Sequence, residues 1–243
     1  MSDVGQWPDD SFGALTLARP LAVLTWSRPL AHWRRDIPPD LLTAADHQRL
    51  GRLRREQDRS RYATARALLH RAGLIAADLG LAPPGTTVRL LTSGSDHGTG
   101  RPVPDLPGWQ VSISHDNTVV VVLSQATVGV DTQGLGSAGT IRELDSVFTA
   151  TERAWLAAHP RDADALRLWT AKEALLKARG TGFLSDPRRP ENDTLQWPGV
   201  QLAHWRPLPD AVAALAVLDD EPVGWPRGWS VFGGRDPGTA RPA

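Results

Sequence analysis

The chain has 243 residues, of which 41% are hydrophobic, so it can bury a substantial core but falls short of two full-sized domains. Its 27 basic and 27 acidic residues cancel, which removes any global electrostatic case for a nucleic-acid or membrane partner. The sequence contains no cysteine, which excludes disulfides, thiolate nucleophiles and thiolate metal sites. The first ten residues carry acids and no apolar stretch, so we expect no signal peptide and a cytoplasmic location.

The first half of the chain predicts a helical stretch flanked by strands. Thr43 and Asp46 form a capping-box pattern, and a basic helical region follows it to about Leu79. Leu68, Leu69 and Ile75, together with Leu79, are expected to form its buried face. Strands are expected at 21–25, 88–92, 111–115 and 119–123, with a Gly- and Pro-rich loop at 93–108 and a hairpin turn at 116–118.

The second half repeats the order of helices followed by strands. Thr149 and Glu152 form another capping-box pattern, and the clearest helix of the chain opens with Asp162 as its cap and ends at Gly180. Helices are expected at 140–147, 149–159 and 162–179, strands at 128–130, 201–206 and 211–218, and a frayed end over the last ten residues. This order predicts an α+β fold with two lobes, residues 1–124 and 125–243.

Two short segments in the second half carry oxygen and nitrogen groups at suggestive spacings. In a strand, Asp131 and Gln133 point to the same face, and two oxygens on one face suit a hard cation such as Mg²⁺. On the clearest helix, Glu173 and Lys177 share a face with Trp169. Taken alone, each segment has an ordinary structural explanation: a strand-end Asp starting a turn, and a surface Glu–Lys pair.

A third segment offers donors for a phosphate. Arg101 lies in a Gly-Arg-Pro sequence, and a strand that follows ends in Ser114 and His115. A single histidine is more often structural or exposed than functional, so His115 alone does not decide the function.

Taken together, these segments resemble the larger, surfactin-synthetase type of 4′-phosphopantetheinyl transferase. The resemblance rests on Gly-Arg-Pro, Ser-Ile-Ser-His, Val-Gly-Val-Asp, Phe-Thr-Ala-Thr-Glu, Trp-Thr-Ala-Lys-Glu-Ala-Leu-Leu-Lys and Gly180-Thr181-Gly182, over about residues 98–182. It implies a monomer of two similar α+β lobes related by pseudo-two-fold symmetry. The implied reaction moves the phosphopantetheine arm of coenzyme A to a serine of an apo acyl or peptidyl carrier protein, with Mg²⁺, releasing 3′,5′-ADP.

The resemblance also implies roles for individual residues. Asp131, Gln133 and Glu173 would be the metal ligands, while Lys177, His115 and Ser114 would meet the diphosphate of coenzyme A. Arg101 would contact the base or a phosphate, and Arg49, Arg52 and Arg61 would contact the 3′-phosphate. Glu173 or Glu152 would accept the proton of the carrier serine, and the sequence does not decide between them.

Two positions depart from the pattern of many relatives. Gln133 replaces a glutamate, which removes a negative charge from the expected metal site. Asp116 follows His115 where a hydroxyl residue is usual, and its carboxylate would repel a phosphate unless it points away or orients His115. We expect one of these two arrangements.

Two other functions compete with the transferase. Gln133 is compatible with a homologue that binds coenzyme A or a carrier without catalysis. Eight arginines between Arg49 and Arg71 are compatible with a nucleic-acid-binding module, although Glu56 and Asp58 interrupt the cluster.

Overall fold

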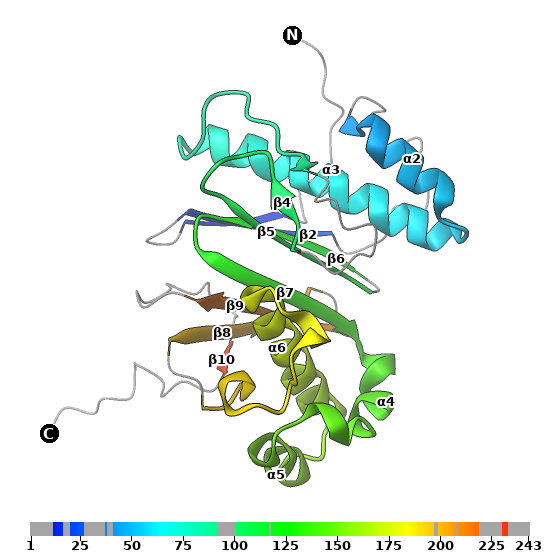
Figure 1. Ribbon diagram of the computed structural model, residues 1–243, viewed down its shortest axis with the longest axis vertical. Helices are drawn as coiled ribbons and strands as arrows, with labels where there is room; N and C mark the ends of the chain where they lie inside the picture. Colours follow the sequence, from blue (N-terminus) through cyan, green and yellow to red (C-terminus); the bar gives the residue numbers. More distant parts are fainter. Residues whose placement is uncertain are drawn as a thin grey trace, which may run out of the picture.

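The computed structural model describes residues 12–16, 20–26, 37, 41–91, 101–116, 118–196, 199–207, 209–218 and 230–232. Groups of strands alternate with groups of helices along the chain (Figure 1). The helices are α2 (Ala44–Arg52), α3 (Glu56–Asp78), α4 (Ala138–Arg142), α5 (Ala150–Ala158) and α6 (Asp162–Arg179). The strands are β1 (Phe12–Thr16), β2 (Pro20–Trp26), β3 (Leu90–Leu91), β4 (Val103–Pro104), β5 (Gln110–His115), β6 (Val119–Ser124), β7 (Thr127–Gly134), β8 (Val200–Trp205), β9 (Ala211–Leu218) and β10 (Ser230–Phe232). Short 3₁₀ turns are η3 (Leu135–Ser137), η4 (Asp145–Val147), η5 (Gly182–Leu184) and η6 (Pro190–Asn192).

The strands build two antiparallel four-stranded sheets and a small β3–β4 pair. The N-terminal sheet has the order β1-β2-β6-β5, and the C-terminal sheet has the order β10-β8-β9-β7. In each sheet a long helix follows an early strand (β2 or β7), and a hairpin (β5–β6 or β8–β9) then places its second strand beside that early strand. The fold is therefore mixed α+β, as the sequence predicts.

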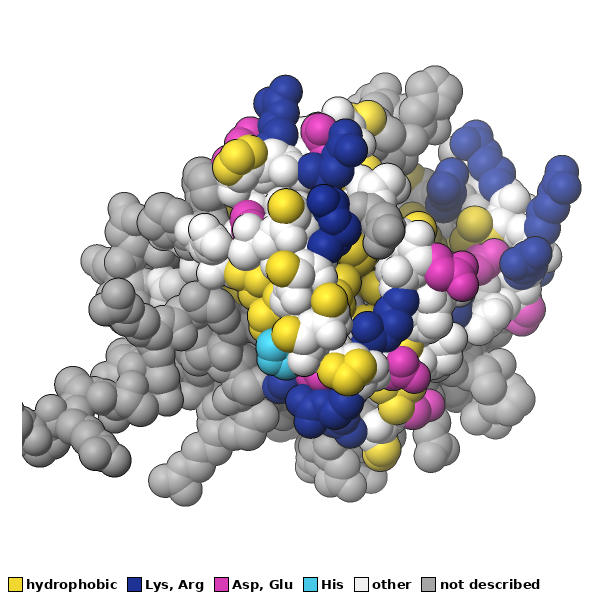
Figure 2. Space-filling view, turned by 90° about the horizontal axis from the view of Figure 1, so that it is seen from below, with side chains coloured by type: hydrophobic (Ala, Val, Ile, Leu, Met, Phe, Trp, Pro, Cys, Tyr) yellow, Lys and Arg dark blue, Asp and Glu magenta, His cyan; other side chains and the backbone are white. Residues whose placement is uncertain are grey.

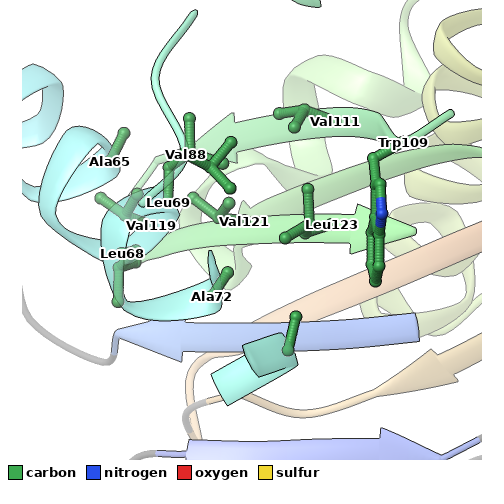
Figure 3. Close-up of a cluster of buried hydrophobic side chains, with 11 residues drawn as sticks. Ala65, Leu68, Leu69, Ala72, Val88, Trp109, Val111, Val119, Val121 and Leu123 are labelled. Carbon is green, nitrogen blue, oxygen red and sulfur yellow. The ribbon is translucent and has the colours of Figure 1, made fainter. Parts of the chain in front are cut away.

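The two sheets pack against each other, and each carries a long helix on its other side. Helix α3 covers the N-terminal sheet with Leu68 and Leu69, which pack on β6 (Figure 3). Helix α6 covers the C-terminal sheet through alanines, including Ala171 and Ala174. In Figure 1 helices α2 and α3 lie at one end of the molecule, while α4 and α5 lie at the other. No helix in the described ranges combines the length and apolarity needed to cross a bilayer.

Strand β6 is buried on both faces because it lies between a helix and a second sheet. Val119, Val121 and Leu123 face α3, whereas Val120 and Val122 pack against the C-terminal sheet. A strand with two buried faces needs a continuous apolar sequence, which explains the Val-Val-Val-Val-Leu run. The core between the sheets is completed by Ala126, Val128, Val130, Leu215 and Val217.

Hydroxyl groups join β5 and the turn before β6 to β7 across the two sheets. The Ser112 Oγ atom accepts a hydrogen bond from the backbone N–H of Val130 at 2.9 Å. The hydroxyls of Thr118 and Thr132 lie 2.9 Å apart in a buried contact. The chain passes from one sheet to the other between Ser124 and Thr127, so this connection is short.

Strand β7 and helix α6 approach so closely that only glycine fits at position 129. A Cβ atom on Gly129 would overlap the backbone O of Ala174 and the backbone N of Ala178. The small side chains of α6 that face the sheet permit the same approach. This contact fixes the spacing between the strand and the helix that carry the candidate site.

Most predicted elements are present, with differences at their ends. Both capping boxes form, at Thr43–Asp46 and Thr149–Glu152. The strand expected at 128–130 is longer, because β7 pairs with β9 over its full length to Gly134. The strand expected at 88–92 is reduced to β3, and residues 92–100 lie outside the described part.

Several expectations about the helices are wrong in detail. The helix expected at 140–147 divides into α4 and the turn η4, since Leu144 leaves the helical region of backbone space. Helix α6 is capped by Arg161 without a side-chain hydrogen bond, so Asp162 belongs to its first turn. Leu79 is 46% exposed and does not belong to the buried face of α3. The expected fraying of the last ten residues falls outside the described ranges.

Candidate active site

Strand β7 presents Asp131 and Gln133 to helix α6. Side chains alternate along the strand, so Val128 and Val130 enter the core between the sheets, whereas residue 129 contacts α6. Asp131 and Gln133 share the face of residue 129. Asp131 is buried, with 1% of its surface exposed, and needs strong partners for its carboxylate.

Helix α6 supplies those partners from successive turns. The Lys177 Nζ atom lies 2.6 Å from Asp131 Oδ1 and 3.4 Å from Glu173 Oε2. Glu173 and Lys177 are four residues apart and therefore project from one face of the helix. Carboxylates that are 42 positions apart in the sequence thus converge on one ammonium group.

Ser114 completes this cluster from the N-terminal sheet. Its hydroxyl donates to Asp131 Oδ1 at 2.7 Å and accepts from the backbone N–H of Thr132 at 3.2 Å. Lys177 Nζ also donates to the Ser114 Oγ atom at 3.2 Å. The cluster therefore draws residues from both sheets and from α6.

The cluster shifts the pKa values of two of its members. Burial and the neighbouring negative charge of Asp131 together raise the pKa of Glu173 to about 7, against the opposing effect of Lys177. Burial would lower the pKa of Lys177, but the charges of Asp131 and Glu173 outweigh this effect and raise it. Glu173 is therefore poised to exchange a proton near neutral pH, while Lys177 stays charged.

The oxygen donors of this cluster fit a hard divalent cation. Asp131 and Glu173 already face one positive charge, and the Gln133 amide lies beside them with its Nε2 atom 3.4 Å from Asp131 Oδ2. Turning this amide over would place its oxygen beside Asp131, where both oxygens could bind a cation. Across the described ranges no three His, Asp or Glu side chains gather into a possible metal site, so the cluster offers only two carboxylates. Such a set suits Mg²⁺, which commonly combines one or two carboxylates with water and substrate phosphates.

A cavity of about 520 Å³ adjoins Lys177. It lies between β5, the segment around Arg101 and the end of α6. Its lining consists of Arg101, Pro102, Val111, Ser112, Ile113, Lys177, Gly180, Thr181, Gly182, Phe183 and Leu184. Cavities of this size accept drug-sized or cofactor-sized ligands.

Phe183 and Leu184 in this lining were not singled out from the sequence. Phe183 stacks on Trp169 with the ring centroids 5.7 Å apart, and it remains 49% exposed. Leu184 is 78% exposed. Two apolar residues placed directly after a helix-ending Gly-Thr-Gly are the sequence signal that would have indicated them.

Arg101 lies in the cavity wall but uses its guanidinium group on helix α6. Its Nη2 atom donates to the backbone carbonyls of Lys177 and Ala178, and its Nη1 atom donates to Gln110 Oε1. Carbonyls at the end of a helix are otherwise unsatisfied, and a cation is favourable there. Burial lowers the pKa of Arg101. Arg101 therefore caps the end of α6, a contact that the sequence did not predict. It also lines the cavity, where it is expected from the sequence to meet a ligand.

His115 and Asp116 lie where β5 ends, next to α3 and the end of β7. Desolvation lowers the pKa of His115, and the positive charges of Arg61 and Lys177 lower it further, although the residue as a whole is exposed. The Asp116 Oδ2 atom accepts from the backbone N–H of Gly134 at 2.8 Å, and its Oδ1 atom lies 3.8 Å from Arg61 Nη2. Asp116 is thus directed toward Gly134 and Arg61, and its two contacts do not involve His115.

The arginines between 49 and 71 do not act as one surface cluster. Arg49 and Arg52 are exposed in the last turns of α2. The Arg59 side chain donates to two backbone carbonyls at the end of α2. Arg66 pairs with Asp46 at 2.8 Å and lies over the Tyr62 ring. These contacts assign part of the cluster to the packing of α2 on α3.

Glu152 lies in the interior and away from the cluster of Asp131, Glu173 and Lys177. It is fully buried and pairs with Lys172 Nζ at 2.8 Å, and Lys172 is equally buried. Its carboxylate also accepts from the backbone N–H groups of Thr149 and Thr194. Since these groups occupy both carboxylate oxygens, this environment favours a structural role for Glu152. Burial lowers the pKa of Lys172, against the effect of Glu152.

Residues 127–223 match the family model of the 4′-phosphopantetheinyl transferase superfamily. The matched segment contains β7 and α6, and therefore Asp131, Gln133, Glu173 and Lys177 of the cluster. No curated protein matches the chain. A superfamily domain of this kind supports a transferase that acts on a phosphopantetheine group.

Proposed function

We propose that the chain transfers the 4′-phosphopantetheine arm of coenzyme A to a serine of an apo acyl or peptidyl carrier protein, releasing 3′,5′-ADP. The observation that carries the proposal is the convergence of Asp131 and Glu173 on Lys177 within the segment that matches the superfamily. A cavity of about 520 Å³ shares Lys177 with this cluster.

Coenzyme A would lie with its diphosphate beside Lys177, Ser114 and His115. Lys177 is a charged donor with a raised pKa, and Ser114 holds its hydroxyl beside the same group. The cavity next to Arg101 would take the nucleoside. Arg61, with Arg49 and Arg52 from the adjoining helix, would meet the 3′-phosphate, because arginine can bind a phosphate with two parallel hydrogen bonds.

Asp131, Glu173 and Gln133 would hold a Mg²⁺ ion, which when bound would neutralise charge that develops on the diphosphate oxygens. Lys177 now balances the two carboxylates, with 2.6 Å to Asp131 Oδ1 and 3.4 Å to Glu173 Oε2. Its flexible stem lets the same ammonium group turn toward a phosphate at the mouth of the cavity.

Glu173 would accept the proton of the carrier serine. Its pKa of about 7 suits a general base that works near neutral pH. Its side chain is 19% exposed, whereas Glu152 is fully buried and occupied by Lys172. We therefore assign the proton transfer to Glu173 and the capping of α5 to Glu152.

The length and topology fit the larger, surfactin-synthetase type of the family. We infer two lobes, residues 1–124 and 125–243, related by a pseudo-two-fold axis, because the strand order β2-β6-β5 in one sheet corresponds to the order β7-β9-β8 in the other. A chain that carries both lobes would work as a monomer. Cytoplasmic carrier proteins of secondary metabolism would be its partners.

The two competing functions explain less of the geometry. A nucleic-acid module needs a coherent basic surface, but Arg59 and Arg66 are engaged in packing. Figure 2 views the opposite end of the molecule, which carries α4 and α5, and shows acidic side chains beside several of the basic ones there. A non-catalytic homologue remains a second candidate because Gln133 replaces a carboxylate. Against it, both carboxylates and the lysine of the cluster are present.

Mass spectrometry of an apo carrier protein incubated with the chain, Mg²⁺ and coenzyme A tests the proposal. The carrier should gain the mass of one phosphopantetheine group. Glu173→Gln should slow this gain by at least about 100-fold, because general-base groups contribute roughly 10²–10⁴-fold. The matched control Glu143→Gln changes an exposed glutamate of the same lobe and should leave the rate unchanged. No mass gain on fatty-acid, polyketide and peptide-synthetase carriers would refute the catalytic function.

A further inference from the structure

Asp116 is a carboxylate placed beside a candidate phosphate-binding arginine. Its Oδ1 atom lies 3.8 Å from Arg61 Nη2, and the two side chains are 30% and 18% exposed. Arg61 also lies 3.8 Å from Asp58 Oδ1, and its buried Nε atom has no hydrogen-bond partner within the described ranges. Among the described residues, the carboxylates paired with Arg61 thus lie at the long distance of 3.8 Å from its Nη atoms.

The other oxygen of Asp116 fixes the end of the strand that carries the carboxylate cluster. Asp116 Oδ2 accepts from the backbone N–H of Gly134 at 2.8 Å. Gly134 is the last residue of β7 and directly follows Gln133. The backbone N–H of Asp116 itself bonds to the carbonyl of Thr118 at 2.9 Å, which holds its turn in place. One side chain thus connects α3, the turn after β5 and the end of β7.

We propose that Asp116 is a positioning residue with two separable effects. Its charge competes with the nucleotide 3′-phosphate for Arg61 and so weakens nucleotide binding. Its hydrogen bond to Gly134 holds the end of β7, and with it Asp131 and Gln133, in place for transfer. The inference rests on the proposed function, since that function supplies the phosphate.

Two substitutions separate these effects. Asp116→Asn removes the charge and keeps an oxygen that can accept from Gly134 N–H, whereas Asp116→Ala removes both. The matched control is Asp105→Asn, because Asp105 also accepts one backbone N–H, from Arg89 at 2.7 Å, and the variant loses the same charge. The control should bind nucleotide and transfer phosphopantetheine as the parent does.

Calorimetric titration with 3′,5′-ADP tests the effect of the charge. Asp116→Asn should lower the dissociation constant about two- to fivefold, the range expected for removing one partly exposed ion pair. Binding of 5′-ADP, which lacks the 3′-phosphate, should not change. In an Arg61→Ala background the Asp116→Asn substitution should have no effect.

Transfer kinetics and hydrogen exchange test the effect of the hydrogen bond. Asp116→Asn should lower the KM for coenzyme A and keep kcat, whereas Asp116→Ala should lower kcat as well. Protection of the Gly134 amide should fall in Asp116→Ala only. Equal kinetic effects in the two variants would overturn the positioning role.

The titrations separate failure of this inference from failure of the proposed function. The inference on the charge is overturned if the parent binds 3′,5′-ADP but Asp116→Asn binds it no more tightly. It is also overturned if Asp116→Asn tightens binding by the same factor in the Arg61→Ala background. In both cases the proposed function stands. If the parent binds neither 3′,5′-ADP nor coenzyme A, both are overturned.

Discussion

Glu173 and Glu152, the two candidates for the general base that the sequence leaves open, have opposite environments in the structure. Glu173 lies beside Asp131 and Lys177 at a cavity, whereas Glu152 pairs with a fully buried Lys172. Both glutamates lie on helices that the sequence predicts, but the sequence does not show which face of each helix meets the interior. The two lysines of the sequence differ in the same way, because Lys172 lies in the core and Lys177 at the candidate site.

His204 predicts a loss of stability in mild acid. Burial lowers its pKa to about 4, against the effect of a hydrogen bond to the Arg167 carbonyl. In the unfolded chain this histidine has a pKa of about 6.5, so between about pH 6.5 and pH 4 it binds a proton there but stays neutral in the folded chain. Stability should therefore be complete above about pH 6.5 and fall by up to about 3 kcal/mol as the pH drops to about 4.

Urea unfolding at several pH values measures this dependence. The variant His204→Gln keeps an N–H donor for the Arg167 carbonyl but has no titratable group. Its stability should change less between pH 7 and pH 4 than that of the parent. Parallel curves for the parent and the variant would contradict the role of His204.

At the scale of single residues, the sequence predicts the cluster better than its surroundings. Asp131, Glu173 and Lys177 come together as their spacing and the family resemblance suggest. Arg101 was expected to face a ligand, yet its guanidinium group bonds to carbonyls at the end of α6. Such a contact depends on how a loop meets a helix 76 residues away, which no local pattern contains.

At the scale of elements, Gly129 sets the distance between β7 and α6. Gly129→Ala should lower the free energy of unfolding by at least about 1–3 kcal/mol, the usual cost of overpacking, because the obstructing atoms belong to the backbone. Gly51→Ala is the matched control, since its Cβ would meet nothing within 4 Å and alanine favours a helix by about 0.5–1 kcal/mol. Denaturant titration should give shifts of opposite sign, and an unchanged midpoint for Gly129→Ala would contradict this account.

Elements with local signals are predicted well, and those defined by pairing are not. The capping boxes of α2 and α5 and the glycine that ends α6 locate three helix ends, and Gly180 has the left-handed backbone expected there, with φ 71°. Strands β1 and β10 were not predicted, because they are recognised by their antiparallel pairing with β2 and β8 and not by a local sequence pattern. Strand β7 is longer than its apolar run because β9 continues alongside it.

At the scale of the whole molecule, the two sheets should unfold together. They share a core that includes Val122, Val130 and Leu215, and Ser112 accepts from a backbone N–H of β7. Peptides from α3 and β6 should lose hydrogen-exchange protection at the same denaturant concentration as peptides from α6 and β9. Two separate midpoints would show instead that each sheet is stable alone.

The repetition of helices followed by strands predicts the class of fold but not how its halves meet. The equivalent strand orders of the two sheets become visible only when the pairing of β2 with β6 and of β7 with β9 is known. Contacts between residues far apart in the chain carry this information, and the turn patterns of the sequence do not.

The sandwich of two sheets has a practical consequence for anyone who wishes to isolate the portion that matches the superfamily. A fragment of residues 127–223 would lose β6 and leave the apolar side chains of Val128, Val130, Leu215 and Val217 in water. Such a bare, valine-rich surface invites self-association into insoluble aggregates. Work on the chemistry of β7 and α6 therefore calls for the intact polypeptide.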